Sequence, residues 1–259
     1  MTERLAVRAS FSRAAARYAA AAGLQRVVCD RLLELLPDRS ARRVLDLGCG
    51  TGFASAGLLA RYPQAVHCAT DFSLGMLRVH ERGSDIARVC ADAHYLPFAS
   101  ASADLVFSSL MLQWCDLPVA LSECRRVLGD GGHMCFSTVL QGTLAEIDAA
   151  FSGLDAHRHT VAFPTAQALS LALTDSGFTV EQMRCETHVE HFTDARALLQ
   201  SNRDIGASHV PYGARRTLLG RAALRQVCER LESRRDESGV PLTYQLAWVV
   251  ARPSSGERS

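Results

Sequence analysis

The first 36 residues carry apolar side chains at the spacing of a helix. From Phe11 to Leu36 these positions fall three or four residues apart, and Pro37 ends the pattern. We therefore expect an N-terminal helix over residues 11–36. Its apolar positions are Leu24, Val27, Val28, Leu32, Leu35 and Leu36.

From residue 43 to about residue 139, short apolar runs alternate with helical stretches. This alternation is typical of a parallel sheet with helices on both faces. A capped helix from Thr165 to Asp175 and two further apolar runs follow. Together the pattern predicts a seven-stranded, Rossmann-like α/β sheet. The predicted strands are 44–47, 65–69, 86–90, 104–107, 133–139, 178–187 and 242–251, and the helices between them include 53–60 and 118–128.

Two segments do not belong to this minimal sheet, residues 140–164 and 190–240. Each is too short for a core of its own, so we expect one domain over residues 1–259. Both segments follow strands beyond the first half of the sheet. They are therefore predicted to form a helical lid over a ligand held by residues 43–139.

The composition narrows the range of partners and compartments. A net charge of +1 gives no electrostatic reason to expect a nucleic-acid or membrane partner, although all 28 basic residues are arginine. Nine cysteines without a C-x-x-C pair indicate free thiols rather than disulfides or a metal site. The first ten residues lack the apolar core of a signal peptide, and no apolar stretch approaches the about 20 residues that span a bilayer. We expect a cytoplasmic protein without a metal.

The run from Val44 to Gly52 combines a strand, an acid and three alternate glycines. Asp46 lies at the carboxyl end of the strand, where open parallel sheets bind ligands. Gly48, Gly50 and Gly52 allow a tight turn and are expected to expose bare N–H groups to a ligand. A glycine-rich turn without any ligand is the alternative.

Two further acids follow the next two predicted strands. Asp71 suits a pair of ribose hydroxyls, and Asp92 comes after the strand at 86–90. The loop reads G-x-G-x-G rather than the G-x-G-x-x-G of dinucleotide-binding folds, which disfavours an NAD-dependent dehydrogenase. Together these features resemble class I S-adenosylmethionine (SAM) methyltransferases.

That resemblance implies a SAM site. Asp46 and the three glycines would hold the methionine half, Asp71 the ribose, and Asp92 with Ala93 the adenine. Phe72 and Met76 are expected to flank the adenine ring, although Met76 also suits a core position. Ser108 and Ser109 end the fourth strand and are expected beside the sulfonium.

Five segments outside these motifs resemble one family, the malonyl-[acyl-carrier protein] O-methyltransferases of biotin synthesis. Their order and spacing cover roughly residues 11–251. The segments are F-S-R-A-A-A-R-Y at 11–18, L-M-L-Q-W at 110–114, L-Q-G-T-L at 140–144, I-G-A-S-H at 205–209 and P-L-T-Y at 241–244.

This resemblance implies methyl transfer from SAM to the free carboxylate of a malonyl thioester on acyl-carrier protein. A carboxylate with a pKa of about 4 is ionised at neutral pH, so no general base is required. Three alternatives remain open. They are a methyltransferase for another small acid of the aconitate type, a C-methyltransferase of quinone synthesis, and a SAM-binding regulatory module without turnover.

The same resemblance implies residues that position the acceptor. Arg203 is expected to bind the malonyl carboxylate, with His209 and Tyr244 in support. Gln113 and Trp114 would lie between cofactor and acceptor, and Tyr18 with Arg13 would close over the cofactor. The structural alternatives are a surface arginine, a hydrogen-bonded histidine and a packed tryptophan.

A run of arginines without an intervening acid follows in the second insertion. Acyl-carrier proteins are acidic, so these side chains are expected to dock the carrier. A solvated charged face is the alternative, since acidic residues follow soon after. The arginines are Arg215, Arg216, Arg221 and Arg225.

Overall fold

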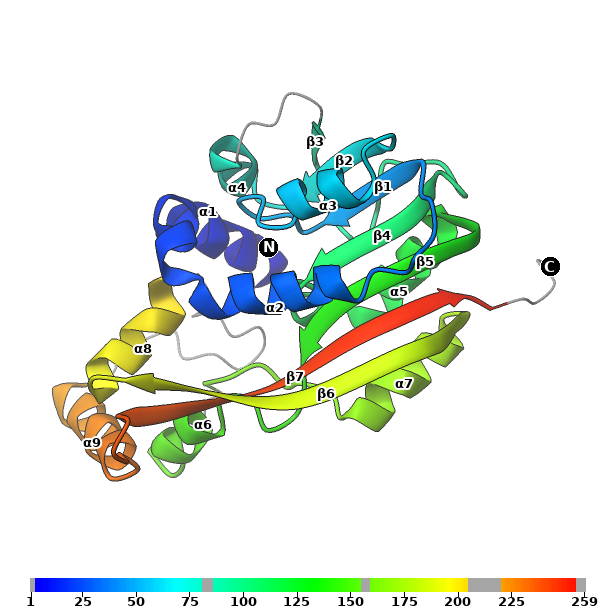
Figure 1. Ribbon diagram of the computed structural model, residues 1–259. Coiled ribbons are helices and arrows are strands. Elements are labelled where there is room, and N and C mark those ends of the chain that lie inside the picture. Colours follow the sequence, from blue (N-terminus) through cyan, green and yellow to red (C-terminus); the bar gives the residue numbers. More distant parts are fainter. Residues whose placement is uncertain (1–2, 81–85, 155–158, 205–219, 255–259) are drawn as a thin grey trace.

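The computed structural model describes residues 3–80, 86–154, 159–204 and 220–254. These residues contain a single seven-stranded sheet with the strand order β3-β2-β1-β4-β5-β7-β6, which confirms the predicted fold class (Figure 1). The strands are β1 (Arg43–Leu47), β2 (Val66–Asp71), β3 (Ile86–Cys90), β4 (Ala103–Ser109), β5 (Leu128–Val139), β6 (Phe178–Phe192) and β7 (Val240–Pro253).

The strand order reverses direction between β1 and β4. The pairs β1–β2, β2–β3, β1–β4 and β4–β5 are all parallel, whereas β7 runs antiparallel to both β5 and β6. From β1 the chain crosses over to β2 and then β3 on one side, whereas from β4 it crosses over to β5 on the other side. This arrangement opens a crevice at the carboxyl ends of β1 and β4, which is where parallel sheets bind ligands.

Helices cover both faces of the sheet. They are α1 (Glu3–Ala21), α2 (Gly23–Glu34), α3 (Ser55–Arg61), α4 (Leu74–Val79), α5 (Leu117–Val127), α6 (Ala145–Phe151), α7 (Ala166–Asp175), α8 (Ala195–Asp204) and α9 (Arg221–Glu232), with a 3₁₀ turn η1 (Leu112–Trp114). In Figure 1, α2 and α3 lie in front of the sheet, and α5 and α7 lie behind it. None of the helices described is long and apolar enough to span a membrane.

Strand alternation divides the core into two layers. Val44, on β1, packs with the buried side chains of α2 and α3. Its neighbour Leu45 points to the opposite face and packs with α5 and α7. Because successive side chains of a strand point to opposite faces, buried strands need apolar residues at every position.

The predicted helix over 11–36 is two helices in the structure. α1 begins at Glu3, eight positions earlier than predicted, and the chain bends at the buried Ala22, whose backbone angles (φ −93°, ψ 48°) are not helical. α2 remains on the face of the sheet, whereas α1 leaves it and contacts α4 and α8. The alanine-rich stretch before the bend lacks the large apolar side chains that would have kept α1 on the sheet.

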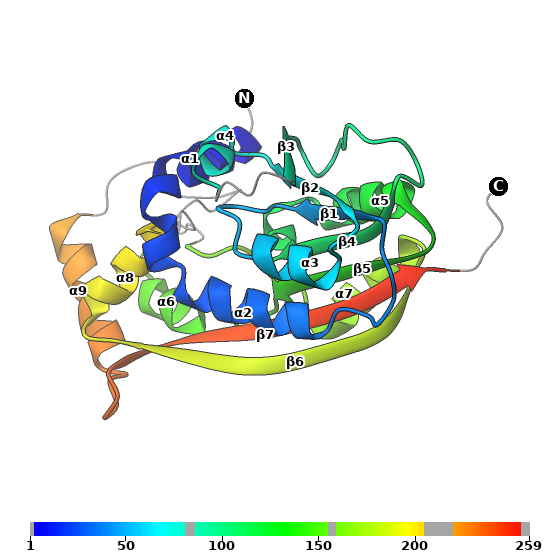
Figure 2. The same cartoon turned by 45° about the horizontal axis from the view of Figure 1, so that its top comes forward.

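The last two strands extend beyond the rest of the sheet. β6 and β7 pair over their whole length, but β5 accompanies β7 only from Met134 to Val139. The remaining two-stranded ribbon carries α6, α8 and α9, which contact it or one another. Figure 2 shows this ribbon along one edge, with the three helices at the end where the parallel strands finish. β5 begins at Leu128, before the predicted strand start at residue 133.

Candidate active site

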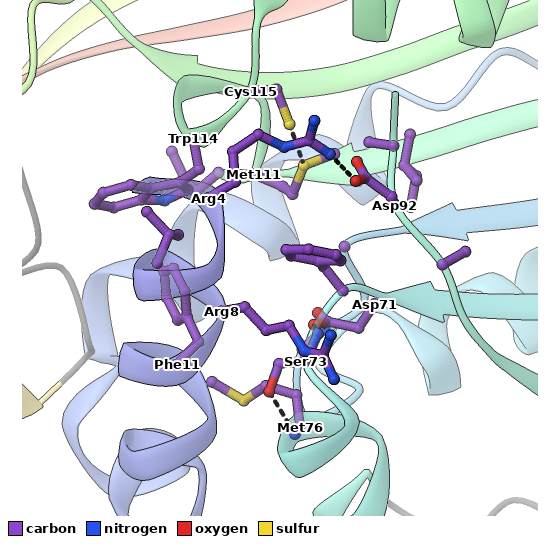
Figure 3. A pocket seen from close by; sticks show the side chains of 18 of the residues that line it. Arg4, Arg8, Phe11, Asp71, Ser73, Met76, Asp92, Met111, Trp114 and Cys115 are labelled. Atoms are coloured by element: carbon purple, nitrogen blue, oxygen red, sulfur yellow. Dashed lines mark hydrogen bonds and ion pairs between the residues drawn. The ribbon is translucent and has the colours of Figure 1, made fainter. Parts of the chain in front are cut away.

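A pocket lies at the carboxyl ends of β1, β2, β3 and β4, beneath α1 (Figure 3). Its floor comes from the glycine loop and the ends of the strands, and its cover comes from the first turns of α1. Among the residues predicted from sequence, those that line it are Tyr18, Gly48, Gly50, Asp71, Phe72, Met76, Asp92, Ala93, Ser109 and Trp114.

The glycine loop shapes the pocket rather than offering free N–H groups. The N–H of Gly48 donates to Thr70 O (2.8 Å), that of Gly50 to Asp71 Oδ2 (3.0 Å) and that of Gly52 to Cys49 O (2.9 Å). The expectation of bare N–H groups is therefore wrong. The steric requirement is real, because Gly48 has φ +73° and a Cβ there would lie 2.2 Å from Met111 Cγ.

Asp71 is fixed by the backbone around it. Its Oδ2 accepts from Gly50 N–H, and its Oδ1 accepts from Ser73 N–H at 2.7 Å. Burial raises the pKa of this carboxyl to about 6, although both hydrogen bonds act in the opposite direction. These two contacts hold the carboxylate of Asp71 at the pocket wall.

Asp46 is buried behind the glycine loop with one oxygen unsatisfied. Its side chain does not line the pocket directly, and Oδ2 has no hydrogen-bond partner. Burial and the nearby Asp71 raise the pKa of Asp46 to about 7. A buried carboxylate oxygen without a donor is costly, which indicates that a cationic or donor group completes this end of the site.

Three side chains stack over the same end. The Tyr18 ring lies 5.9 Å from the ring of Phe53 at an interplanar angle of 23°. The Arg26 guanidinium lies 4.3 Å from the same Phe53 ring, in the segment between Gly52 and α3. Tyr18 is half-buried. Desolvation of its hydroxyl, together with Asp71 and Cys29, raises the pKa of that hydroxyl. The stack joins α1, α2 and the glycine loop. Arg13 is exposed and does not line the pocket.

The other end of the pocket combines an acid, a ring and two arginines. Asp92 pairs with Arg4 of α1, and the Arg4 and Arg8 guanidinium groups lie 5.9 Å and 5.3 Å from the Phe72 ring. Figure 3 shows Arg4 crossing the pocket to reach Asp92. Met76 is buried below, so this end offers an apolar slot with a carboxylate at its edge.

Ser109, rather than Ser108, faces the pocket. The Ser108 hydroxyl is fully buried and donates to Leu47 O at 2.8 Å, which ties β4 to β1. Ser109 lines the pocket, and its hydroxyl lies 3.1 Å from that of Ser137. The assignment of Ser108 to the cofactor therefore moves to Ser109.

Gln113 stabilises the turn that follows β4. Its amide donates to Leu110 O at 2.8 Å, and its oxygen accepts from Thr138 at 3.5 Å. Leu110 has φ +49°, a strained backbone conformation for a leucine, and it lines the pocket. Gln113 thus holds the pocket wall from behind, whereas Trp114 lines the pocket and meets the Phe11 ring edge-on at 5.4 Å.

Of the other residues predicted for the acceptor and its carrier, Tyr244, Arg221 and Arg225 are described by the structure, and none of these three lines the pocket. Tyr244 packs in the core on β7, near Glu146 of α6, with 8% of its surface exposed. Arg203 is in α8, but its side chain lies outside the described residues, as do His209, Arg215 and Arg216. Arg221 and Arg225 are exposed, one turn apart on α9.

Comparisons with known proteins identify the family. The family model of a methyltransferase domain matches residues 45–136. Malonyl-[acyl-carrier protein] O-methyltransferases of Dechloromonas aromatica and Herminiimonas arsenicoxydans are 39% and 42% identical over 95% and 96% of this chain, and over 93% and 95% of their own lengths. The chain belongs to the malonyl-[acyl-carrier protein] O-methyltransferase family.

A solved structure supports the fold independently of sequence. One chain in the complex of the Haloferax volcanii Trm112 methyltransferase activator with a methyltransferase superposes with a TM-score of 0.64. It is 17% identical and is matched over 98% of this chain and 100% of its own. The predicted class of enzyme, a SAM-dependent methyltransferase, is confirmed, and the dehydrogenase alternative is excluded.

The pocket is closed on one side by residues that the sequence patterns did not reveal. Arg4, Arg8 and Phe11 lie on one side of α1 and point into the pocket. Their spacing of four and three residues is helical and would have been informative had the helix been extended to residue 3. His94 and Phe53 were also missed, since nothing local distinguishes them from core residues.

A metal site was not expected, and among the residues that the structure describes no group of three or more potential ligands comes together.

Proposed function

We propose that this protein transfers a methyl group from SAM to the free carboxylate of malonyl-[acyl-carrier protein], giving the methyl ester that starts pimeloyl assembly for biotin synthesis. The observation that carries the proposal is the identity of 39–42% with enzymes of that name over at least 95% of this chain. The assignment of individual residues rests on the geometry of the pocket.

The pocket suits SAM at both ends and in the middle. The buried, unsatisfied Asp46 oxygen lies behind the glycine loop, at the end proposed for the ammonium and carboxylate of the cofactor. Asp71 offers a fixed carboxylate to two ribose hydroxyls. Phe72 and Met76 supply apolar surface for a flat base, and Asp92 supplies an acceptor for its amino group.

The bound cofactor would supply a methyl carbon attached to a positively charged sulfur. In the reaction a carboxylate oxygen forms a bond to that carbon, and the pair of electrons of the carbon–sulfur bond stays on sulfur. The products are a neutral ester and a thioether, and no proton moves. Because the reactants' opposite charges disappear, a dry apolar site favours the transition state over the separated ions.

The apolar wall near Ser109 therefore favours the reaction. Phe11, Met111 and Trp114 line the pocket there and exclude water, and the strained Leu110 keeps the turn close to the end of β4. The protein has to align the two reacting atoms and hold the acceptor without removing its nucleophilicity.

We propose that Arg203 binds the carboxylate of the acceptor, and that His209 and Tyr244 are supporting residues. α8, which carries Arg203, contacts α1 directly, and α1 covers the pocket. A guanidinium is the group that best matches a carboxylate. The arginines at 215, 216, 221 and 225 are the proposed docking face for the acidic carrier.

We also propose that the enzyme works in the cytoplasm. All nine cysteines are free, which suits a reducing compartment.

The decisive experiment measures transfer of a labelled methyl group from SAM into malonyl-[acyl-carrier protein], with malonyl-coenzyme A and free malonate alongside. Labelling of the carrier-bound substrate, removed by mild alkali as expected of an ester, supports the proposal. Labelling of free malonate alone would reassign the enzyme to small acids. Cofactor binding without transfer to any of the three would indicate a regulatory module.

A further inference from the structure

The proposed adenine acceptor Asp92 lies where the sheet does little to orient it. It follows β3, the edge strand, in a short segment closed by an isolated bridge between Asp92 and Tyr95. A carboxylate that reads one amino group must present one oxygen in a fixed direction. Some other contact must therefore set the Asp92 side chain.

His94 makes that contact twice. Its backbone N–H donates to Asp92 Oδ1 at 3.0 Å, and its ring Nδ1 lies 2.7 Å from the same oxygen. The His94 side chain is buried, with 4% of the residue exposed. One oxygen of Asp92 is thus held by a single residue through two donors.

The opposite side of the ring fixes which nitrogen carries the proton. The Asp116 backbone N–H donates to His94 Nε2 at 2.8 Å. A backbone amide can only donate, so Nε2 must be an unprotonated acceptor and Nδ1 must carry the hydrogen. The ring is therefore neutral and donates to Asp92. Asp116 is in turn the N-cap of α5, which gives the ring a rigid support.

The remaining oxygen of Asp92 faces the pocket. Oδ2 is the atom that pairs with Arg4, which reaches across from α1. In this structure a cationic N–H donor occupies the position that an amino group would take.

We infer that His94 is the positioning residue that directs Asp92 Oδ2 toward the exocyclic amino group of the adenine, and that it thereby sets the preference for an adenosyl cofactor. The inference rests on the proposed SAM site and adds a residue that acts through Asp92.

The test compares the binding of S-adenosylhomocysteine and S-inosylhomocysteine by calorimetry. The inosyl ligand has a carbonyl oxygen in place of the amino group, so it presents an acceptor rather than a donor to Asp92 Oδ2. The wild-type protein should prefer the adenosyl ligand by about tenfold to a hundredfold, the size of one hydrogen bond to a charged group. In His94→Gln, whose amide cannot reach Asp92 from the Nδ1 position, most of that preference should disappear through weaker adenosyl binding alone.

Two further variants keep the result interpretable. His94→Asn places an amide N–H near the position of Nδ1, so it should retain most of the preference. His133→Ala removes a buried histidine of β5 that lies beside Glu181 of β6, away from the pocket. This variant should leave both affinities unchanged.

The possible outcomes are distinct. Equal weakening of both ligands in His94→Gln, or identical behaviour of the Asn and Gln variants, would overturn the positioning role. If the wild-type protein bound neither ligand, the cofactor assignment itself would fall, and the inference with it.

Discussion

Ser12 on α1 and Ser73 at the N-cap of α4 share a hydrogen bond, with their hydroxyl oxygens 2.7 Å apart. The two helices approach this closely because α4 carries a glycine at position 75. A Cβ there would lie 2.9 Å from Ser12 Cα and 3.0 Å from Ser12 O. The contact fixes the cover of the pocket to its floor.

Gly75→Ala should therefore destabilise the protein by about 1–3 kcal/mol, because a rigid backbone would have to move away. Thermal unfolding measures the loss, and the affinity for S-adenosylhomocysteine should fall with it. Gly23→Ala is the matched control, since nothing lies within 4 Å of its Cβ position at the start of α2. That variant should be more stable by about 0.4–1 kcal/mol. Equal stability of the two variants would contradict the importance of this contact.

Cofactor binding should depend on pH through Asp46 and Asp71. Burial raises the pKa of these carboxyls to about 7 and about 6, above the value of 3.8 expected in the unfolded chain. The folded protein without ligand therefore holds protons that the unfolded chain releases, and it loses stability as the pH rises from about 4 to about 7.

A positively charged cofactor favours the ionised carboxylates. Binding should release protons, and the affinity for SAM should rise between about pH 5.5 and pH 7.5. Calorimetry in two buffers with different ionisation enthalpies counts the protons. Asp46→Asn should weaken binding and reduce the proton release. A pH-independent affinity would mean that neither carboxyl titrates on binding.

How far the sequence alone predicts the site depends on how local each signal is. Asp46, Asp71 and Asp92 were identified because each lies at or just after the carboxyl end of a strand. The choice between Ser108 and Ser109 needed the strand register, since a shift of one residue exchanges the two faces. The bare N–H groups expected of the glycine loop were an error of the same kind, because Thr70 and Asp71 on the neighbouring strand take up two of them.

The residues of α1 that cover the pocket could not be predicted from the sequence patterns, for a different reason. Arg4 and Arg8 contact Asp92 and Phe72, which are distant in the sequence and come close only in the folded protein. The residues next to Arg4 and Arg8 along the chain therefore do not indicate these contacts. The bend at Ala22, directly before Gly23, likewise depends on where α1 packs, on α4 and α8.

Arg203→Ala should lower the rate of methyl transfer to malonyl-[acyl-carrier protein] by at least about tenfold, the effect of losing one charged hydrogen bond. SAM affinity should stay close to that of the wild type, because the lost contact belongs to the acceptor. Arg196→Ala, at an exposed arginine of the same helix, is the control. If both variants retained full activity, another residue would have to bind the acceptor carboxylate.

Reversing charge at two exposed positions of α9, in the double variant Arg221→Glu and Arg225→Glu, should weaken recognition of the carrier. The apparent KM for malonyl-[acyl-carrier protein] should rise by roughly tenfold at low ionic strength, and the difference should shrink in high salt. Any turnover of malonyl-coenzyme A should be less affected. The control reverses Arg78 and Arg88, which are exposed on α4 and β3. Similar losses in both double variants would show a general charge effect rather than docking.

The ribbon of β6 and β7 projects beyond the rest of the sheet. β5 last pairs with β7 at Val139 and Leu246, and beyond that pair β7 keeps its ladder with β6 as far as Phe192 and Val240. Its other edge there bonds to the segment after β5, where Leu140 N–H donates to Gln245 O and Leu144 N–H donates to Thr243 O. The strands that hold the three acids share no hydrogen-bond ladder with this outer part. If α8 and α9 meet the acceptor as proposed, substitutions in them change which acceptor is methylated without altering the strands that hold the three acids.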